Sequence, residues 1–279
     1  MSDLECHSFS IVTPNYNMGG YLEETILSVI ENLEPGDEYY IIDGGSTDSS
    51  VDIIKKYESH ITRWISEPDK GYSDALFKGF NLSAAPLMCW INSGDVLLSG
   101  SLNIARKYFK SMNCDLLYCD DYYIDENGKV LQLSKGNVTN LKNMMLFGGW
   151  TPLQDACFWR RQLYARIGGI NPNIQLAADF DLFLNMSMHG YCSYLPAVMS
   201  AFRRHNEQKS IHYSSEYINE KNKIINHALK LERCEGVCRM MKKLIYGFMV
   251  RLRYRIKCLY SRKTENLGGN IKQLNAEAY

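Results

Sequence analysis

The stretch FSIVTPNYNMGGYLEETILSVI, residues 9–30, sets a pattern that the first half of the chain repeats. Phe9 to Thr13 is an apolar run of strand length, and polar residues follow it directly. Apolar residues then recur at helical spacing from Tyr21 to Ile30. The stretch therefore predicts a buried strand, a polar turn and a helix.

The same unit returns along the next 65 or so residues. Strands are expected at 39–42, 61–65 and 87–91, and helices at 51–57 and 73–80, with Asp48 placed to cap the first of these helices. Strands that alternate with helices of this size predict an α/β fold, with a mostly parallel sheet and helices on both faces.

The second half is less regular. Strands are expected at 116–119 and 122–133, around a turn at 125–128, and again at 155–159 and 191–202. Helices are expected near 162–167 and from Asp179 onward.

The composition, 46% hydrophobic and 22% charged over 279 residues, is that of an ordinary globular protein with a sizeable core. The formal net charge is zero, which argues against a nucleic-acid partner.

The charges are distributed unevenly along the chain, because residues 233–263 carry ten Lys or Arg and one acidic residue. A basic tail on an acidic body indicates an anionic surface as a partner.

Nine cysteines are scattered without a C-x-x-C pair, which disfavours a disulfide framework and a structural zinc site. The N-terminus lacks the apolar core of a signal peptide, and no run reaches the length of a membrane-spanning helix. We therefore expect a cytoplasmic protein, in solution or peripheral on the inner face of the cytoplasmic membrane.

Ligands of open parallel sheets bind beyond the carboxyl ends of the strands. The residues after the four predicted strands are polar, acidic and glycine-rich, as in CWINSGD at 89–95. No dinucleotide fingerprint, NTPase phosphate loop or serine-hydrolase elbow is present. The remaining chemistry consists of isolated carboxylates: Asp43, Asp69, Asp74, Asp95, Asp179 and Asp181. A divalent cation such as Mg²⁺ or Mn²⁺ needs few protein oxygens when a diphosphate supplies the others.

Five ordered blocks carry a resemblance. They are IVTPNYNMGGYLEETILSVI (11–30), YYIIDGGSTDSSVDIIKKY (39–57), SEPDKGYSDALFKGFNLSAAPLMCWINSGDVLL (66–98), ACFWRRQLYARIGGINPNIQLAADFDLFLNM (156–186) and FRRHNEQKS (202–210). In this order they resemble family 2 glycosyltransferases, especially those that assemble bacterial surface polysaccharides. The resemblance implies a Rossmann-like GT-A fold and transfer of a sugar, with inversion, from a nucleotide donor to an acceptor hydroxyl.

Carried over to this chain, the resemblance implies a role for each matching residue. Pro14, Asn15, Tyr16 and Asn17 would line the nucleotide pocket, where Asp43 and Gly44 would meet the base or ribose. Asp69, Lys70, Gly71 and Asp74 would lie near the nucleotide and the donor sugar. Asn92 and Ser93 would contact the donor, Asp95 would bind the metal with help from His205, and Asp179 would be the catalytic base.

Several of these residues could also have purely structural roles. Asp179 and Asp181 are acidic residues at a predicted helix N-terminus, where the helix dipole favours them, and His205 is equally compatible with a surface position beside two arginines. Gly94 stands where relatives usually carry a second acidic residue. It therefore favours the main alternative, a non-catalytic nucleotide-sugar binding or scaffold protein. A sugar nucleotidyltransferase fits less well, because its glycine- and arginine-rich N-terminal loop is missing.

The chain thus divides into an expected donor-binding half at 1–112, an acceptor-binding half with the base at 113–212, and a basic helical tail at 213–279. The expected donor is a UDP-sugar and the expected acceptor a glycan or lipid-linked saccharide, in polysaccharide, O-antigen or capsule assembly. Within the tail, residues 236–263 form an amphipathic pattern, with apolar residues at 241, 244, 245, 248, 252, 256 and 259. Such a helix either lies on a membrane surface or packs on the domain with its basic face in solvent.

Overall fold

The computed structural model describes residues 7–136, 140–205, 214–232 and 236–261, apart from the side chains of residues 214, 236–238 and 253–261. The strands are β1 (Phe9–Asn15), β2 (Glu38–Asp43), β3 (Arg63–Ser66), β4 (Leu87–Trp90), β5 (Val96–Leu97), β6 (Leu116–Ile124), β7 (Val130–Ser134), β8 (Cys157–Arg160) and β9 (Cys192–Arg203). The helices are α1 (Gly19–Asn32), α2 (Ser50–Lys56), α3 (Tyr72–Leu82), α4 (Ser101–Ser111), α5 (Leu141–Gly148), α6 (Arg161–Arg166), α7 (Ala178–His189), α9 (Ser214–Leu231) and α10 (Gly236–Ser261), with 3-10 turns η2 (Glu58–His60) and η3 (Gln154–Ala156).

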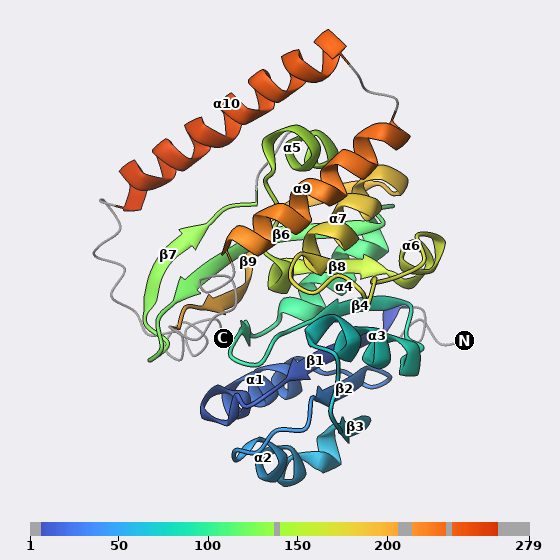
Figure 1. The fold of residues 1–279 in the computed structure, drawn as a ribbon. Helices are drawn as coiled ribbons and strands as arrows, with labels where there is room; N and C mark the ends of the chain where they lie inside the picture. Colours follow the sequence, from blue (N-terminus) through green and yellow to red (C-terminus); the bar gives the residue numbers. More distant parts are fainter. Residues whose placement is uncertain (1–6, 137–139, 206–213, 233–235, 262–279) are drawn as a thin grey trace.

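The first half forms the predicted parallel sheet, with neighbouring strands in the order β3-β2-β1-β4 (Figure 1). From β1 the chain adds β2 and β3 in one direction, through helices α1 and α2, and then crosses back through α3 to place β4 on the other side of β1. Because parallel crossovers are right-handed, α1 and α2 lie on one face and α3 on the other. The strands end side by side, with Asn15 paired to Asp43 and Asp43 to Ser66. The predicted α/β class is thereby confirmed, and the polar segments after the strands meet at one edge.

The sheet continues into the second half through β8, which pairs antiparallel with both β4 and β6. Strand β6 also pairs in parallel with β9 and forms a hairpin with β7. The sequence predicted two segments where β6 runs unbroken from Leu116 to Ile124. Irregular register against β9 near Asp120 absorbs the interruption that the sequence pattern indicated. One sheet therefore crosses the expected boundary at residues 112 and 113, and the division into two halves stays a prediction.

An aromatic cluster fixes α7 to the middle of the sheet. Trp90 of β4 stacks on Phe183 of α7 with ring centroids 5.7 Å apart, and Trp159 of β8 and Phe80 of α3 pack edge-on around Trp90. All four side chains are buried. Burial of several large aromatic side chains is among the strongest stabilising terms available to a core. The N-terminus of α7, which carries Asp179, is therefore held in a fixed position over the sheet.

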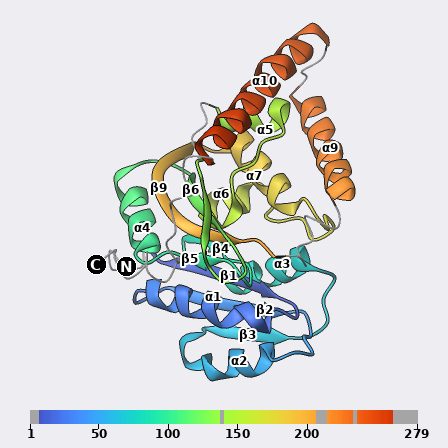
Figure 2. The same cartoon turned by 90° about the vertical axis from the view of Figure 1, so that its left-hand side faces the viewer.

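The expected tail contains two helices with different surroundings. Helix α9 packs against α7 and α5, whereas α10 packs mainly against α5 and lies across the end of the molecule farthest from β3 (Figures 1 and 2). No helix in the described part of the chain is both long enough and apolar enough to cross a membrane.

Candidate active site

The ends of β1, β2 and β3 are joined through the carboxylate of Asp43. One of its oxygens accepts hydrogen bonds from Asn15 Nδ2 at 2.6 Å and Ser46 Oγ at 2.5 Å, and the other accepts from Ser46 N at 2.9 Å and Ser66 Oγ at 2.6 Å. Burial raises the pKa of Asp43, but these donors lower it more, so that the net pKa lies below its ordinary value. Asp43 is thus an ionised carboxylate that fixes the loops at the sheet edge, and its contact with a base or ribose stays a prediction.

The loop after β3 lies against the loop after β2. A Cβ atom built on Gly44 would lie 2.9 Å from the Asp69 carboxylate, so a larger residue at position 44 would displace that side chain. Asp69 accepts a hydrogen bond from Gly71 N at 2.8 Å, and Asp74 accepts one from Lys70 N at 3.2 Å. These contacts shape the turn that begins α3. They bring the four predicted residues of this segment to the same edge as Asn15 and Asp43.

Asp95 lies just after β4 and is 4% exposed. Its Oδ1 accepts a hydrogen bond from Arg203 N at 3.0 Å, and its Oδ2 accepts from the side-chain amides of Asn92 and Gln154, both at 3.3 Å. Ser93 Oγ donates to the carbonyl of Pro14 at 3.1 Å, which joins this segment to the end of β1. The sequence did not single out Gln154, because its approach to Asp95 depends on the placement of η3 beside β4.

Gly94 has a backbone reason to be glycine. Its φ of +110° lies in a region that residues with a Cβ rarely adopt. Its amide donates to Thr25 Oγ1 at 2.9 Å, and its carbonyl accepts from Arg203 Nε at 2.8 Å. The residue therefore joins α1, the β4 edge and β9 through main-chain groups. The absence of a second carboxylate here follows from this conformation and does not by itself indicate a lost activity.

Two further buried carboxylates, Asp121 and Asp155, lie near Asp95 and were not predicted. Burial raises the pKa of Asp155 to about 6, and burial together with Asp155 raises the pKa of Asp95 well above its ordinary range. The guanidinium of Arg203 also forms an ion pair with Glu24 at 2.6 Å, and its charge offsets only part of the rise in the pKa of Asp95. Hydrogen bonding with Asp121 and Ser200 lowers the pKa of Asp155 only in part. The three carboxyl groups thus lie together in a buried environment that disfavours their ionised forms.

A divalent cation held through Asp95 fits this environment. Such an ion would stabilise the ionised carboxylate that burial disfavours, and it prefers oxygen ligands. Within the described residues, no group of three or more His, Cys, Asp and Glu side chains is arranged to hold a metal ion by itself. The remaining ligands would then be diphosphate and water oxygens. His205 lies beside Tyr21 of α1, with ring centroids 5.6 Å apart, and its metal role stays a prediction.

The first predicted segment divides into buried and exposed parts. Pro14 and Asn15 are buried, whereas Tyr16 is 62% exposed at the rim. Asn17 accepts a hydrogen bond from Thr47 N at 2.8 Å and has a φ of +51°.

The last block of the resemblance, residues 202–210, is described only as far as His205, so residues 206–210 lie outside the described part of the chain.

Asp179 stands in the first turn of α7, with its Oδ1 atom buried and lacking a hydrogen-bond partner. Burial raises its pKa to about 6, against the opposing effects of the Phe180 amide and the Lys221 ammonium group. Burial also raises the pKa of Asp181, and a hydrogen bond with Asn185 offsets part of this rise. A carboxylate with a pKa near 6 is ionised at neutral pH and still basic enough to accept a proton.

Asp179 is held by residues that sequence patterns did not reveal. Tyr72 of α3 donates its hydroxyl to Leu176 O at 3.3 Å and accepts from Ala178 N at 3.1 Å. Glu220 of α9 accepts hydrogen bonds from three successive backbone amides of the preceding loop, at 2.7 to 3.0 Å, from Gln175, Leu176 and Ala177. Because α3 begins directly after Gly71, these contacts connect the base to the donor loops.

Lys221 of α9 lies close enough to Asp179 for the charge of each to shift the pKa of the other. Its ammonium group lies 4.7 Å from the centre of the Phe180 ring and bonds to the carbonyl of Gly149. Burial lowers the pKa of Lys221, and the charge of Asp179 raises it. This arrangement places a cation beside the candidate base without neutralising it through a direct ion pair.

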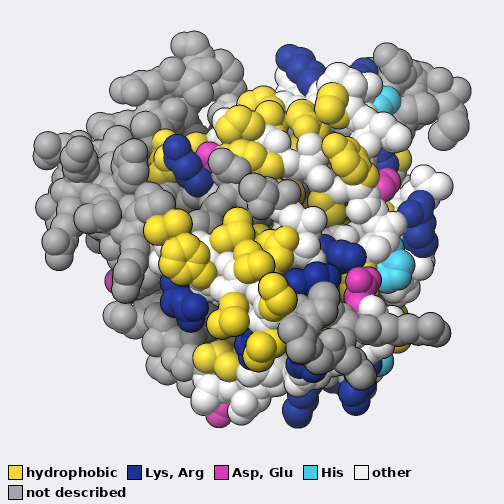
Figure 3. Space-filling model, turned by 90° about the horizontal axis from the view of Figure 1, so that it is seen from above, with side chains coloured by type: hydrophobic (Ala, Val, Ile, Leu, Met, Phe, Trp, Pro, Cys, Tyr) yellow, Lys and Arg dark blue, Asp and Glu magenta, His cyan; other side chains and the backbone are white. Residues whose placement is uncertain are grey.

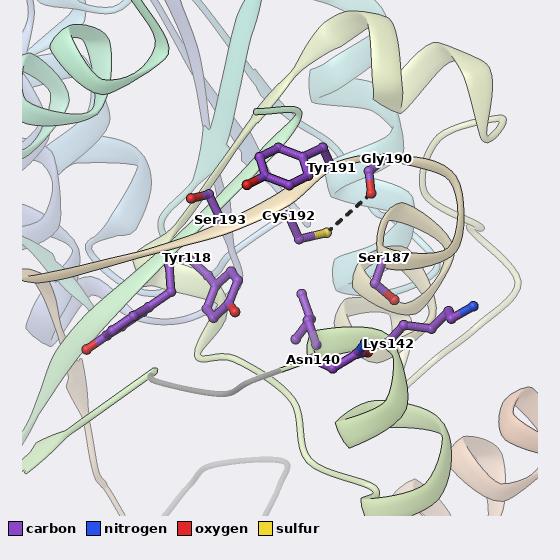
Figure 4. Close-up of a pocket in the computed structure, with 10 residues that line it drawn as sticks. Tyr118, Asn140, Lys142, Ser187, Gly190, Tyr191, Cys192 and Ser193 are labelled. Atoms are coloured by element: carbon purple, nitrogen blue, oxygen red, sulfur yellow. Dashed lines mark hydrogen bonds between the residues drawn. The ribbon is translucent and has the colours of Figure 1, made fainter. Parts of the chain in front are cut away.

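A separate cavity of about 410 Å³ opens at the other end of α7 (Figure 4). It is lined by Tyr118, Asn140, Leu141, Lys142, Ser187, Gly190, Tyr191, Cys192, Ser193 and Tyr194. Its position at the starts of β6 and β9 is remote from Asp179, and it contains none of the predicted site residues. The candidate active site is thus the edge formed by the carboxyl ends of the strands.

Comparison with known proteins decides the family of this α/β chain. Residues 10–167, more than half of the sequence, match the family model of Glycosyl transferase family 2. The chain belongs to glycosyl transferase family 2. The matched segment contains the donor edge from Asn15 to Asp95, whereas Asp179 lies after it.

This family 2 glycosyltransferase is similar to bacterial proteins that are named as biosynthesis glycosyltransferases. It is 24% identical over 178 residues to a PGL/p-HBAD biosynthesis glycosyltransferase of Mycobacterium bovis, covering 62% of this chain and 67% of that protein. It is 27% identical over 110 residues to the putative teichuronic acid biosynthesis glycosyltransferase TuaG of Bacillus subtilis, covering 38% and 43%.

Solved structures confirm the GT-A type fold. S. aureus TarS in complex with UDP-GlcNAc superposes with a TM-score of 0.63 at 16% identity, covering 80% of this chain and 66% of that one. The mannosyltransferase PcManGT from Pyrobaculum calidifontis, in complex with GDP-Man and Mn²⁺, gives a TM-score of 0.62 at 13% identity, covering 97% and 79%. At these identities the likeness concerns the fold.

Proposed function

We propose that this protein transfers a sugar from a nucleoside-diphosphate donor, expected to be a UDP-sugar, to a hydroxyl group of a glycan or lipid-linked saccharide, with inversion at the anomeric carbon. The product would be part of a surface polysaccharide, O-antigen or capsule. The names of the relatives support a surface glycan, and the UDP-GlcNAc and GDP-Man bound to two structural neighbours support a nucleotide-sugar donor.

The observation that carries this proposal is the environment of Asp179. In an inverting transfer, the acceptor oxygen loses a proton as it attacks the anomeric carbon, and the nucleoside diphosphate leaves from the opposite side. The base must be ionised before the reaction and must accept a proton during it. A partly buried carboxylate with one unpartnered oxygen and a pKa near 6 meets both requirements. Its connection through Tyr72 to the Asp69–Gly71 turn supports a position beside the donor sugar.

We propose that Asp95 holds the divalent ion, Mn²⁺ or Mg²⁺, that accompanies the donor diphosphate. When bound, such an ion neutralises negative charge that develops on a leaving diphosphate. The chain's own contribution is to fix the Asp95 carboxylate through Arg203 N and the amides of Asn92 and Gln154. Asp121 and Asp155 would add negative potential that favours a cation at this edge.

The alternative of a non-catalytic nucleotide-sugar binding protein rested mainly on Gly94. That support is weakened, because the φ of +110° accounts for the glycine without any loss of activity. The unpartnered Oδ1 of Asp179 favours catalysis over simple binding, because a purely structural carboxylate would be expected to accept hydrogen bonds from its surroundings.

A thermal-shift panel of nucleotide sugars tests the donor and metal parts of the proposal. We expect a UDP-sugar with Mn²⁺ to raise the melting temperature of the wild type and to have little effect on Asp95→Asn. The matched control is Asp52→Asn, which removes an exposed carboxylate from α2. A shift with Asp95→Asn equal to that of the wild type would contradict the metal assignment. No shift with any nucleotide sugar would contradict the donor class.

A further inference from the structure

Helix α10 packs on the body through one side only. Tyr246 accepts a hydrogen bond from Asn143 Nδ2 at 3.0 Å, and its ring stacks on Phe147 of α5 with centroids 6.1 Å apart. Lys242, one turn earlier, lies with its ammonium group 5.4 Å from the centre of the same Phe147 ring. Val250, one turn later, lies over Gly148, where a Cβ atom would be only 2.7 Å from it. The packed side therefore consists of residues spaced four apart.

The opposite side of α10 is apolar and faces away from the body. Six large apolar side chains on it are each between 45% and 61% exposed: Met240, Met241, Leu244, Ile245, Phe248 and Leu252. They are spaced three and four apart, so they form one continuous stripe along the helix, which we call the outer stripe. Hydrophobic side chains gather on the face of the molecule that Figure 3 shows, with Lys and Arg around them.

This orientation is the reverse of that of an ordinary surface helix, which buries its apolar side against the core. The sequence left two possibilities for the tail, and one of them was a helix whose basic face alone meets solvent. In the structure, the outer stripe meets solvent. A contiguous exposed apolar surface on a globular protein marks an interaction site.

The charge of α10 indicates what covers the outer stripe. Between Gly236 and Ser261 the helix contains seven Lys or Arg and no acidic residue. Lys243 and Arg251 are exposed and lie along the stripe. Two copies paired through this face would bring two strongly basic helices together, which is unfavourable. An anionic lipid surface satisfies both features, because its acyl chains receive the apolar side chains and its phosphates receive the basic ones.

We propose that the outer stripe of α10 docks the protein on the surface of a membrane that contains anionic phospholipid. The helix is 26 residues long, which corresponds to about 39 Å at the usual rise per residue, and it would lie in the plane of the interface. Because α10 packs on α5 and α5 packs on α7, docking would hold Asp179 at a set height above the lipid. The inference does not depend on the proposed transfer reaction, since lipid binding requires neither donor nor acceptor.

Flotation of the full-length protein with lipid vesicles tests this inference. We expect the wild type to float with phosphatidylcholine vesicles that contain phosphatidylglycerol and to remain behind with phosphatidylcholine alone. The double variant Leu244→Gln/Phe248→Gln, which keeps good helix formers, should bind anionic vesicles at least tenfold more weakly. Lys243→Gln/Arg251→Gln should reduce binding and its sensitivity to salt. Ile104→Gln on α4, a comparably exposed apolar residue elsewhere, is the matched control and should bind as the wild type does.

Results of two kinds would overturn the inference, the first concerning flotation and the second self-association. One is a wild type that does not float with anionic vesicles, or a Leu244→Gln/Phe248→Gln variant that floats as well as the wild type. The other is a dimer in analytical ultracentrifugation that dissociates in this variant without any vesicle binding, because a second copy would then cover the outer stripe. Circular dichroism melting of each variant establishes that its fold is intact.

Discussion

The hydroxyl group of Tyr72 accepts a hydrogen bond of 3.1 Å from the backbone amide of Ala178, the residue directly before Asp179. Tyr72 is the first residue of α3, and the turn that precedes it is formed by Asp69 and Gly71. One side chain therefore ties the segment expected to meet the donor to the segment that carries the candidate base. We therefore expect this contact to help set the relative position of donor and base.

Removing the hydroxyl group should affect the reaction more than donor binding. Tyr72→Phe leaves the Ala178 amide without this partner, at a cost of about 1–3 kcal/mol. We expect kcat to fall about tenfold, as about 1.4 kcal/mol of lost positioning would give, with donor affinity changed less than twofold. Steady-state kinetics and donor titration measure the two quantities. Tyr40→Phe removes a similar bond to Leu82 O, away from Asp179, and should leave kcat unchanged. Equal effects of the two variants would contradict a positioning role.

The raised pKa of Asp179 predicts opposite effects of pH on activity and stability. The base must be ionised, so kcat/KM should fall as the pH drops through about 6. The pKa of Asp179 in the folded state exceeds the ordinary value of about 3.9. At a pH between these two pKa values, Asp179 is therefore protonated in the folded state and ionised in the unfolded chain. Stability attributable to this group is therefore lost as pH rises through that window. Asp179→Asn should raise the melting temperature at pH 8 but not at pH 4, and an equal effect at both would contradict the shift.

Lys221 should tune the base. Its positive charge lowers the pKa of Asp179, although burial dominates that pKa. In Lys221→Met the acidic limb of the kcat/KM profile should therefore move to higher pH. Lys223→Met removes an exposed lysine from the same helix and serves as the control. The pH profiles of the two variants decide the matter, because a purely structural role for Lys221 would lower the rate without moving the limb.

A carboxylate at position 94 should not improve the site. The φ of +110° makes any side chain there unfavourable, by about 1–2 kcal/mol or more. We expect Gly94→Asp and Gly94→Ala to lose similar stability in urea denaturation, and neither to bind Mn²⁺ with donor more tightly than the wild type. Tighter metal binding by Gly94→Asp alone would show that the missing carboxylate matters more than the backbone.

The sequence predicts well those features that depend on local pattern. The strands β1 to β4 and the helices between them follow from apolar periodicity, and the common edge of the strands follows from their parallel order. Asp43 reaches that edge as the last residue of β2, and Asp69 and Asp95 reach it from the loops that follow β3 and β4. The family resemblance supplied Asp179 as a candidate base, and the structure adds its unpartnered oxygen and raised pKa.

Other features depend on contacts between distant segments. Gln154 reaches Asp95 only because β8 inserts antiparallel beside β4, and Glu220 reaches the loop before α7 from a helix 40 or so residues later in the chain. No periodicity encodes such pairings. The conformation of Gly94 is likewise invisible in the sequence, where it reads as a missing acidic residue. The apolar periodicity of α10 predicted its amphipathic character, but only the packing of Tyr246 on α5 shows which side faces outward.

The most direct test of the central claim is the anomeric configuration of the transfer product, followed by NMR for the wild type and for Asp179→Asn. With the nucleotide sugar identified by thermal shift and a saccharide acceptor, we expect an α-linked donor to give a β-linked product. Asp179→Asn should bind the donor within about twofold of the wild type and lower the transfer rate by a factor of about 10² to 10⁴, the usual contribution of a general base. Retention of configuration, or transfer by Asp179→Asn at the wild-type rate, would contradict the account.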